Sequence, residues 1–359
     1  MGRPNLSEVE NFIKVGLDFI GKRKLEEALD YFYKAIKLEP KNAKAWNNIG
    51  AILHSLGRVK ESLPIFNQAL KLDPKMFKAW LNKGAALHEL KRKEEALTCF
   101  NQALKINPES SEAWLNKGTI YLDMGRFKKA LNCFDDALKF DPKMSEAWYN
   151  KGVIYQTTKK VNEAFECFEN ALEIDPFHKK CWLNKGVILR AFGRTKEAMK
   201  CFEKALNIEP QYPKGWYNLG NSLRSLGKKE EALECFNYAI QFNPEYLEAL
   251  INKGVVLRSL GRKREAIENY KYALELDPDC DSAWYNLGLV FSDDELAEKI
   301  GCYKRAIEIN PHHAKAFANL GIAFSKLGLE DAAFMCFKRA IKLDKKLKGK
   351  LNARYQEYA

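Results

Sequence analysis

Cysteine and histidine are the side chains of this sequence that could hold a metal ion or serve as a nucleophile. Seven of the nine cysteines recur at intervals of 34 or 67 residues, at Cys99, Cys133, Cys167, Cys201, Cys235, Cys302 and Cys336. Stacked helices lie ~8–10 Å apart, whereas a disulfide needs its Cα atoms within ~7 Å, so this spacing excludes a disulfide framework. No C-x-x-C pair suits zinc, and no histidine has partners at ligand spacing. We interpret the recurring cysteines as small, half-buried thiols in a reducing compartment.

Motifs for catalysis are also missing from the sequence. It contains no G-x-x-x-x-G-K-[ST], G-x-G-x-x-G, G-x-S-x-G or H-E-x-x-H. Nearly every residue belongs to the repeat described next, which leaves no room for a catalytic domain. The sequence therefore predicts a protein that is not an enzyme and that needs no cofactor.

A period of 34 residues runs through the whole chain. Prolines occur at 40, 74, 108, 142, 176, 210, 244 and 278, and Pro311 follows after 33 residues. Glycines from Gly16 to Gly288 and alanines from Ala35 to Ala273 keep the same step, and both then shift by the same single residue. If the proline is position 32, ten repeats start at 9, 43, 77, 111, 145, 179, 213, 247, 281 and 314.

Each repeat is expected to form two amphipathic helices, A and B. Helix A presents positions 4, 8 and 11 on one face, for example Trp114, Gly118 and Tyr121. Helix B presents positions 20, 24, 27 and 28, for example Ala130, Phe134, Ala137 and Leu138. Small residues at 8, 20 and 27 let the helices approach, and we expect them to leave a socket that the ring at position 4 fills.

This pattern, W-x-x-[LK]-G-x-x-[YL], then A, then [FY]-x-x-A, then P, resembles the tetratricopeptide repeat over residues 9–347. The resemblance implies an all-α fold, an α-solenoid in which stacked helix-turn-helix hairpins form a right-handed superhelix with helices A along its concave side. It is similar to the superhelical repeats of O-linked N-acetylglucosamine transferase, without a catalytic domain. We expect a cap segment over 1–8, a single array over 9–347 and a basic tail over 348–359. Leu347, Leu351 and Tyr355 could extend that tail as a partial capping helix.

Two repeats depart from the pattern. Pro64 lies inside helix B of repeat 2, which predicts that this helix starts late or bends there. Repeat 9 has lost one residue near 292–301, and Lys299 takes its small buried position. Ser292 and Glu295 have the spacing of a capping box for a re-set helix B. We expect repeat 9 to be locally soft.

Position 6 of helix A is an asparagine in nine of the ten repeats: Asn48, Asn82, Asn116, Asn150, Asn184, Asn218, Asn252, Asn286 and Asn319. Helix propensity does not select asparagine, so another role must. A carboxamide offers a donor and an acceptor, which matches the backbone of an extended peptide. The resemblance to the transferase repeats implies the same, since a similar ladder there holds the main chain of a substrate peptide. The alternatives are that these asparagines bond within the scaffold, or that asparagine is simply common at this position in the repeat family.

Neighbouring positions of helix A refine this hypothesis. Position 5 is mostly apolar, as at Leu115, Tyr149, Leu183 and Tyr217, and these groups could pack against ligand side chains. Position 7 is often lysine, whose stem we expect to lie along the helix pair while the ammonium reaches water. Position 9 is asparagine only at Asn221, and position 5 is never lysine. The clamp by which related chaperone adaptors hold a C-terminal carboxylate is therefore not predicted.

Position 12 changes character along the chain. It is His54 and His88 in early repeats, and Arg190, Arg224 and Arg258 in repeats 6–8, where Lys180 and Lys214 occupy position 2. Repeats 3–5 instead present Glu89, Glu112, Asp123 and Glu146. Arginines at one-repeat spacing could grip acidic or phosphorylated segments. Alternatively, water and neighbouring acids satisfy them.

The overall charge leaves two classes of partner open. The formal net charge is +12, with Lys and Arg interleaved with Glu along most of the chain. We expect a protein-interaction scaffold or adaptor whose protein or peptide ligand is acidic toward repeats 6–8. The alternative is a basic array that binds nucleic acid or another polyanion. No apolar run approaches the ~20 residues that span a bilayer, so we expect a cytoplasmic protein with no membrane segment; monomer and end-to-end dimer both remain open.

Overall fold

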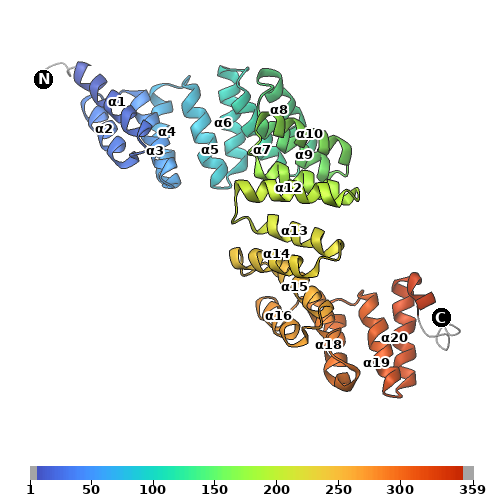
Figure 1. Cartoon of the computed structure of the whole chain (residues 1–359). Coiled ribbons are helices and arrows are strands. Elements are labelled where there is room, and N and C mark those ends of the chain that lie inside the picture. Colours follow the sequence, from blue (N-terminus) through green and yellow to red (C-terminus); the bar gives the residue numbers. More distant parts are fainter. Residues whose placement is uncertain (1–5, 351–359) are drawn as a thin grey trace. The chain divides into compact units, whose positions relative to one another are not determined.

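The computed structural model describes residues 6–350, and within this range every regular element is a helix. Two compact units divide the chain, one ending at Pro176 and the other beginning at Phe177. Each is described by itself, and the single array expected over 9–347 stays a prediction. In both, the stacked helical hairpins confirm the expected fold class (Figure 1).

The first unit holds repeats 1–5, each a hairpin of two helices. Within each hairpin helix A contacts helix B, and helix B contacts helix A of the next repeat. The helices are α1 (Leu6–Gly21), α2 (Leu25–Leu38), α3 (Ala43–Ser55), α4 (Val59–Leu72), α5 (Phe77–Glu89), α6 (Lys93–Ile106), α7 (Ser111–Asp123), α8 (Phe127–Phe140), α9 (Ser145–Thr157) and α10 (Val161–Ile174).

The second unit holds repeats 6–10 and repeats the same contacts between hairpins. Its helices are α11 (Lys179–Ala191), α12 (Thr195–Ile208), α13 (Pro213–Ser225), α14 (Lys229–Phe242), α15 (Leu247–Ser259), α16 (Lys263–Leu276), α17 (Asp281–Gly288), α18 (Leu296–Ile309), α19 (Ala314–Lys326) and α20 (Glu330–Leu343). Two 3-10 helices complete it, η1 (Asp293–Glu295) and η2 (Lys345–Lys350). Leu351 and Tyr355 of the predicted tail helix lie outside the described residues.

The turn between helices A and B depends on a left-handed residue at position 15. Glycine takes this conformation in most repeats, as at Gly125 with φ 68°. Lys91 and Lys159 adopt it with φ 60° and 62°, which shows that the hairpin geometry overrides a local backbone cost. At the other end of the repeat, polar residues cap helix A: the Ser110 hydroxyl accepts a hydrogen bond from the Ala113 amide at 3.1 Å. His178 and His313 cap α11 and α19 in the same way, through Nδ1.

The core of each hairpin corrects the expected socket. The ring that lies over the glycine at position 8 belongs to position 24 of helix B and not to the tryptophan at position 4. A Cβ on Gly118 would lie 2.6 Å from the Phe134 ring, which is fully buried. Trp114 is only half-buried, and its indole N–H donates to the Pro108 carbonyl at 2.9 Å. The tryptophan therefore stabilises the turn between repeats, whereas the phenylalanine fills the core of the hairpin.

The seven recurring cysteines line this core on helix B and are all free and buried. Burial raises the pKa of the Cys133 thiol to about 11 and that of the Cys235 thiol to about 12. A thiol that stays protonated at neutral pH is a poor nucleophile. These positions therefore act as small core side chains, more deeply buried than expected.

The helix that contains Pro64 does not start late, so this one of the two expectations for Pro64 is wrong. Helix α4 begins at Val59, the position at which α6 begins in the next repeat. Proline removes the hydrogen bond to the carbonyl four residues earlier. That carbonyl belongs to Lys60, which is exposed, so water can satisfy it.

The loss of one residue changes the secondary structure of repeat 9. Helix α17 has eight residues, whereas α15 has thirteen. The predicted capping box is present, since the Ser292 amide donates to Glu295 Oε2 at 2.9 Å, but it caps η1, and α18 follows directly. Lys299 is half-buried at the expected small position. Local softness in this repeat stays a prediction.

The contact between positions 8 and 24 can be tested with two glycine substitutions. Gly118→Ala should lower the free energy of unfolding by about 1–3 kcal/mol, because the added methyl overlaps a buried ring that has no room to move. Gly301 is also helical but has no neighbour within 4 Å, so Gly301→Ala should raise it by about 0.5–1 kcal/mol. Urea unfolding followed by circular dichroism measures both, and equal effects would contradict the proposed contact.

Candidate functional site

The asparagines at position 6 form one row in each unit. Helices α3, α5, α7 and α9 carry Asn48, Asn82, Asn116 and Asn150; helices α11, α13, α15, α17 and α19 carry Asn184, Asn218, Asn252, Asn286 and Asn319. Asn150 and Asn218 are buried, and the other seven are half-buried. A row of partly accessible carboxamides therefore runs along the helices A of each unit.

Five of these asparagines make contacts within the scaffold. Across repeats, Asn82 Nδ2 donates to Asn47 Oδ1 at 3.1 Å, and Asn319 Nδ2 donates to the Tyr285 hydroxyl at 3.3 Å. Asn252 Nδ2 lies 3.2 Å both from the Tyr217 hydroxyl and from Asn221 Oδ1. Asn218 and Asn286 each donate to a carbonyl of their own helix at 2.8 Å. Scaffold bonding, one of the alternatives that the sequence left open, is thus present at these positions.

Four asparagines have no such contact within the described residues, and one of them, Asn150, is buried. Asn48, Asn116 and Asn184 are half-buried, and their side chains make no hydrogen bond to any residue in the described range. A carboxamide without a partner keeps two N–H donors and a carbonyl acceptor. These are the positions at which a ligand could be bound without breaking a scaffold contact.

The apolar residues expected at position 5 are placed unequally. Leu115, Tyr149 and Tyr217 are half-buried, whereas Leu183 is only 7 % exposed and packs within the scaffold. The Tyr217 ring lies 5.0 Å from the Tyr246 ring, so it also helps to hold successive repeats together. The lysines at position 7 lie as expected along the helix pair, with Lys117 Nζ 4.6 Å from the centre of the Trp114 ring.

Position 12 is paired with an acid in repeats 2 and 3 of the first unit. His54 Nε2 lies 2.9 Å from Glu89 Oε2, and His88 Nε2 lies 2.7 Å from Asp123 Oδ2. Each pair joins position 12 of one repeat to position 13 of the next. Two of the acids expected to face the groove are therefore engaged by the scaffold.

Position 12 remains open in the second unit. Ser225 and Ser259 occupy position 13 opposite Arg190 and Arg224, so no carboxylate stands there. Within the described residues, Arg190, Arg224 and Arg258 form neither an ion pair nor a hydrogen bond. Arg190 Nη1 is buried without a partner, and burial, together with the charge of Arg224, lowers the pKa of the Arg190 guanidinium. Lys180 and Lys214 are exposed on the same helices.

Tyr270 is a member of this site that reasoning from the sequence missed. Its side chain is fully buried and its hydroxyl has no hydrogen-bond partner, although Arg224 and Arg258 act on it electrostatically. Burial raises the pKa of this phenol despite those charges. Position 24 is phenylalanine in eight repeats and tyrosine only at Tyr270 and Tyr303, and this change at a core position was the available signal. The three open arginines carry donors that can bind oxygen atoms with negative charge, whereas the Tyr270 hydroxyl near them is closed to solvent.

Comparison with known proteins identifies similar repeats over most of the chain. The family model described as the cilia and flagella-associated protein 70 C-terminal domain matches residues 74–250. Tetratricopeptide-repeat models match residues 15–76, 254–294 and 314–347. An uncharacterized protein of Methanocaldococcus jannaschii is 41% identical over 54 residues, which are 15% of this chain and 63% of that protein, less than two thirds of its length.

Two solved structures are similar in fold. A tetratricopeptide repeat protein from Parabacteroides merdae is 23% identical, with a TM-score of 0.53 over 66% of this chain and 94% of that one. PilF of Pseudomonas aeruginosa is 18% identical, with a TM-score of 0.54 over 58% of this chain and 94% of that one. In the described part of this chain, no helix combines the length and apolar character needed to cross a membrane.

The orphaned hydroxyl of Tyr270 can be tested by its removal. Tyr270→Phe should raise the free energy of unfolding by about 1 kcal/mol, because a buried hydroxyl without a partner costs roughly 1–3 kcal/mol. Tyr303→Phe is the matched control and should lower it by about 1 kcal/mol, because Tyr303 loses a hydrogen bond with Asn319. Thermal melting distinguishes these outcomes, and a loss of stability in both variants would contradict the assignment of an orphaned hydroxyl.

Proposed function

We propose that this chain, which is a tetratricopeptide-repeat protein, is an interaction scaffold that binds an extended peptide along its helices A. The observation that carries the proposal is unused hydrogen-bonding capacity that recurs two repeats apart, at Asn48 and Asn116 in the first unit, and that is found again at Asn184 in the second. Such capacity is what a peptide backbone, with a donor and an acceptor in every residue, can use. Under this proposal the chain acts by binding and not by catalysis.

The spacing of the rows suits an extended chain. Successive helices A contact one another, as α5 and α7 do in the first unit and α13 and α15 in the second. Packed helices lie ~8–10 Å apart, and an extended peptide advances ~3.3 Å per residue. About three peptide residues therefore pass each repeat, so about every sixth residue would meet an asparagine without scaffold contacts.

The same spacing predicts which peptide the second unit prefers. Arg190, Arg224 and Arg258 recur once per repeat and have no acidic partner in the described residues. Acidic side chains three residues apart would face them in turn. We propose that repeats 6–8 select a segment with Asp or Glu at every third position.

The asparagines without scaffold contacts provide the test of the peptide-binding row. Peptides selected from a displayed library on the full chain are labelled, and their affinities are measured by fluorescence polarisation. Asn48→Ala, Asn116→Ala and Asn184→Ala combined should weaken binding roughly 10- to 100-fold, since each lost hydrogen bond contributes ~0.5–1.5 kcal/mol. The melting temperature should stay within about 2 °C of the parent, because no scaffold bond is removed.

A matched control uses the same change on the helices B. Asn67, Asn132 and Asn207 are exposed on α4, α8 and α12, away from the rows at position 6. Their combined replacement by alanine should leave affinity unchanged. Equal binding by the two triple variants would exclude the asparagine rows as the peptide site.

The arginines separate an acidic peptide from the alternative ligand, a nucleic acid. Arg190→Gln, Arg224→Gln and Arg258→Gln combined should weaken binding of a peptide with acids at every third position at least tenfold. A peptide of the same composition with clustered acids should bind the parent more weakly. The matched control is the triple change to Gln at Arg194, Arg262 and Arg305, which already pair with Glu197, Glu265 and Asp279.

Single-stranded RNA is titrated against the same variants. A polyanion site predicts that affinity falls steeply with salt concentration and that the sequence of the RNA matters little. RNA could bind more tightly than the acidic peptide, and the triple arginine variant could lose that RNA binding. This result would identify nucleic acid, and not an acidic peptide, as the ligand of repeats 6–8.

A further inference from the structure

The deletion in repeat 9 opens a cavity between repeats 9 and 10. Helix α17 stops at Gly288, and η1 takes the place of the turns that complete the other helices A of this unit. The cavity has a volume of about 140 Å³ and is lined by Asp293, Lys299, Tyr303, Asn319 and Lys326, with aliphatic side chains completing the wall. Asn319 is also the last member of the asparagine row, so the cavity adjoins the proposed path of the peptide.

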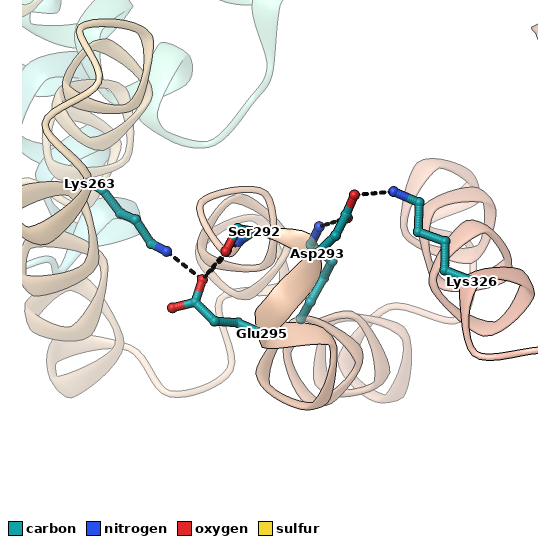
Figure 2. A network of polar contacts seen from close by, with 6 residues as sticks. Lys263, Ser292, Asp293, Glu295 and Lys326 are labelled. Carbon is teal, nitrogen blue, oxygen red and sulfur yellow. Dashed lines mark hydrogen bonds and ion pairs between the residues drawn. The ribbon is translucent and has the colours of Figure 1, made fainter.

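An ion network holds the polar side of this cavity (Figure 2). Asp293 accepts from Lys299 Nζ at 2.9 Å and pairs with Lys326. Glu295 pairs with Lys263 of repeat 8 and accepts from the Ser292 hydroxyl at 2.8 Å. These contacts join η1 to both of its neighbouring repeats, and they place the charged groups of Asp293, Lys299 and Lys326 along one side of the cavity.

The donors of the cavity exceed its acceptors. The Lys299 side chain is 16% exposed, and its ammonium uses one of three donors within the described residues, on Asp293. In the part of the chain that the structure describes, Lys326 is bound only to Asp293. The two lysines hold the pKa of the Asp293 carboxyl at about 2, so at neutral pH the three groups carry a net charge of +1. One further monoanion would balance that charge.

The size of the cavity limits what can enter. A cavity of ~150 Å³ is known to hold a molecule the size of benzene. The end of an acidic side chain fits within such a volume, and its methylene groups would meet the aliphatic wall. A phosphate carries about −1.5 to −2 charges, which would exceed the single positive charge that is available.

We infer that this cavity is a subsite for a carboxylate group of the bound peptide. Lys299 and Lys326 would donate hydrogen bonds to that carboxylate as well as to Asp293. The side-chain amide of Asn319 would bind the peptide beside it. The inference rests on the proposed function for its peptide, but the cavity alone can be tested with small carboxylates. A side-chain carboxylate and a chain-terminal carboxylate present the same chemistry, and separate probes distinguish them.

The test is a titration of the ¹⁵N-labelled full chain, followed by amide shifts in transverse-relaxation-optimised NMR spectra. N-acetylglutamate methylamide presents a side-chain carboxylate, and N-acetylglycine presents a terminal one. At least one should cause saturable shifts confined to residues 289–303 and 319–326, and the one that binds more tightly identifies the source. N-acetylglutamine methylamide, which is the same size as the first probe but uncharged, should cause no such shifts.

Two substitutions assign the binding to the lysines. Lys299→Met keeps the length of the stem and should weaken the effective probe at least tenfold. Lys326→Met should do the same, and because Lys326 is 45% exposed it decides the question if the first variant fails to fold. Lys342→Met changes an exposed lysine of α20 that does not line the cavity, and should leave binding unchanged.

Several results would overturn the inference. These are equal binding of the uncharged probe, tighter binding of a phosphoserine probe, or full affinity in both lysine variants. If selected peptides bind the asparagine row while no small carboxylate perturbs the cavity, this inference fails and the proposed function stands. If the small carboxylate binds the cavity and no peptide binds the row, the proposed function fails instead.

Discussion

The contact between the aromatic ring at position 24 and the bare backbone at position 8 is the constraint on which the rest of the structure depends. The ring of Phe134 occupies the space in which a Cβ of Gly118 would lie, and Tyr270 takes the same place at Gly254. Because the ring is fully buried, it sets the separation of the two helices in each hairpin. Hairpins of the same dimensions then stack through equivalent faces, and every position of helix A recurs once per repeat.

Because of this recurrence, equivalent side chains of successive repeats form rows. The residue that each side chain meets in the next repeat determines whether it is free to bind a ligand. At position 12 of the first unit, His54 and His88 meet Glu89 and Asp123, and the scaffold satisfies both sides of each pair. In the second unit, Ser225 and Ser259 stand in the positions of those acids, and the arginines opposite them stay unpaired within the described residues. The same geometry therefore yields paired side chains at position 12 in repeats 2 and 3 and unpaired arginines there in repeats 6–8.

Repeat 9 shows what the repeat tolerates when the period is broken. The loss of one residue shortens α17 to eight residues, yet Tyr303 still packs against Gly288, with 2.6 Å from its ring to where a Cβ would lie. The contact between positions 8 and 24 is thus preserved, although helix A of this repeat ends early. Charged contacts of Asp293 and Glu295 with both neighbouring repeats replace the lost helical packing.

Much of the fold and part of the candidate site follow from local spacing. The spacing of Ser292 and Glu295 predicted their hydrogen bonds, because the two residues are three positions apart. The proline and glycine intervals predicted the stacked helical hairpins, because the same local pattern recurs in each repeat. The asparagine rows were predictable for the same reason. The roles of Trp114 and Phe134 were not, since both are aromatic and only the packing of helix B against helix A decides which ring covers the glycine. Three features depend on side chains about 30 residues or more apart in sequence: which asparagines bond across repeats, which partners Arg190 and Tyr270 lack, and the cavity that brings Lys299 close to Lys326. The sequence by itself determined the repeat and the residues it displays; only the tertiary structure decided which of them the scaffold has already satisfied, because hydrogen bonding across repeats is set by three-dimensional neighbours that no local pattern encodes.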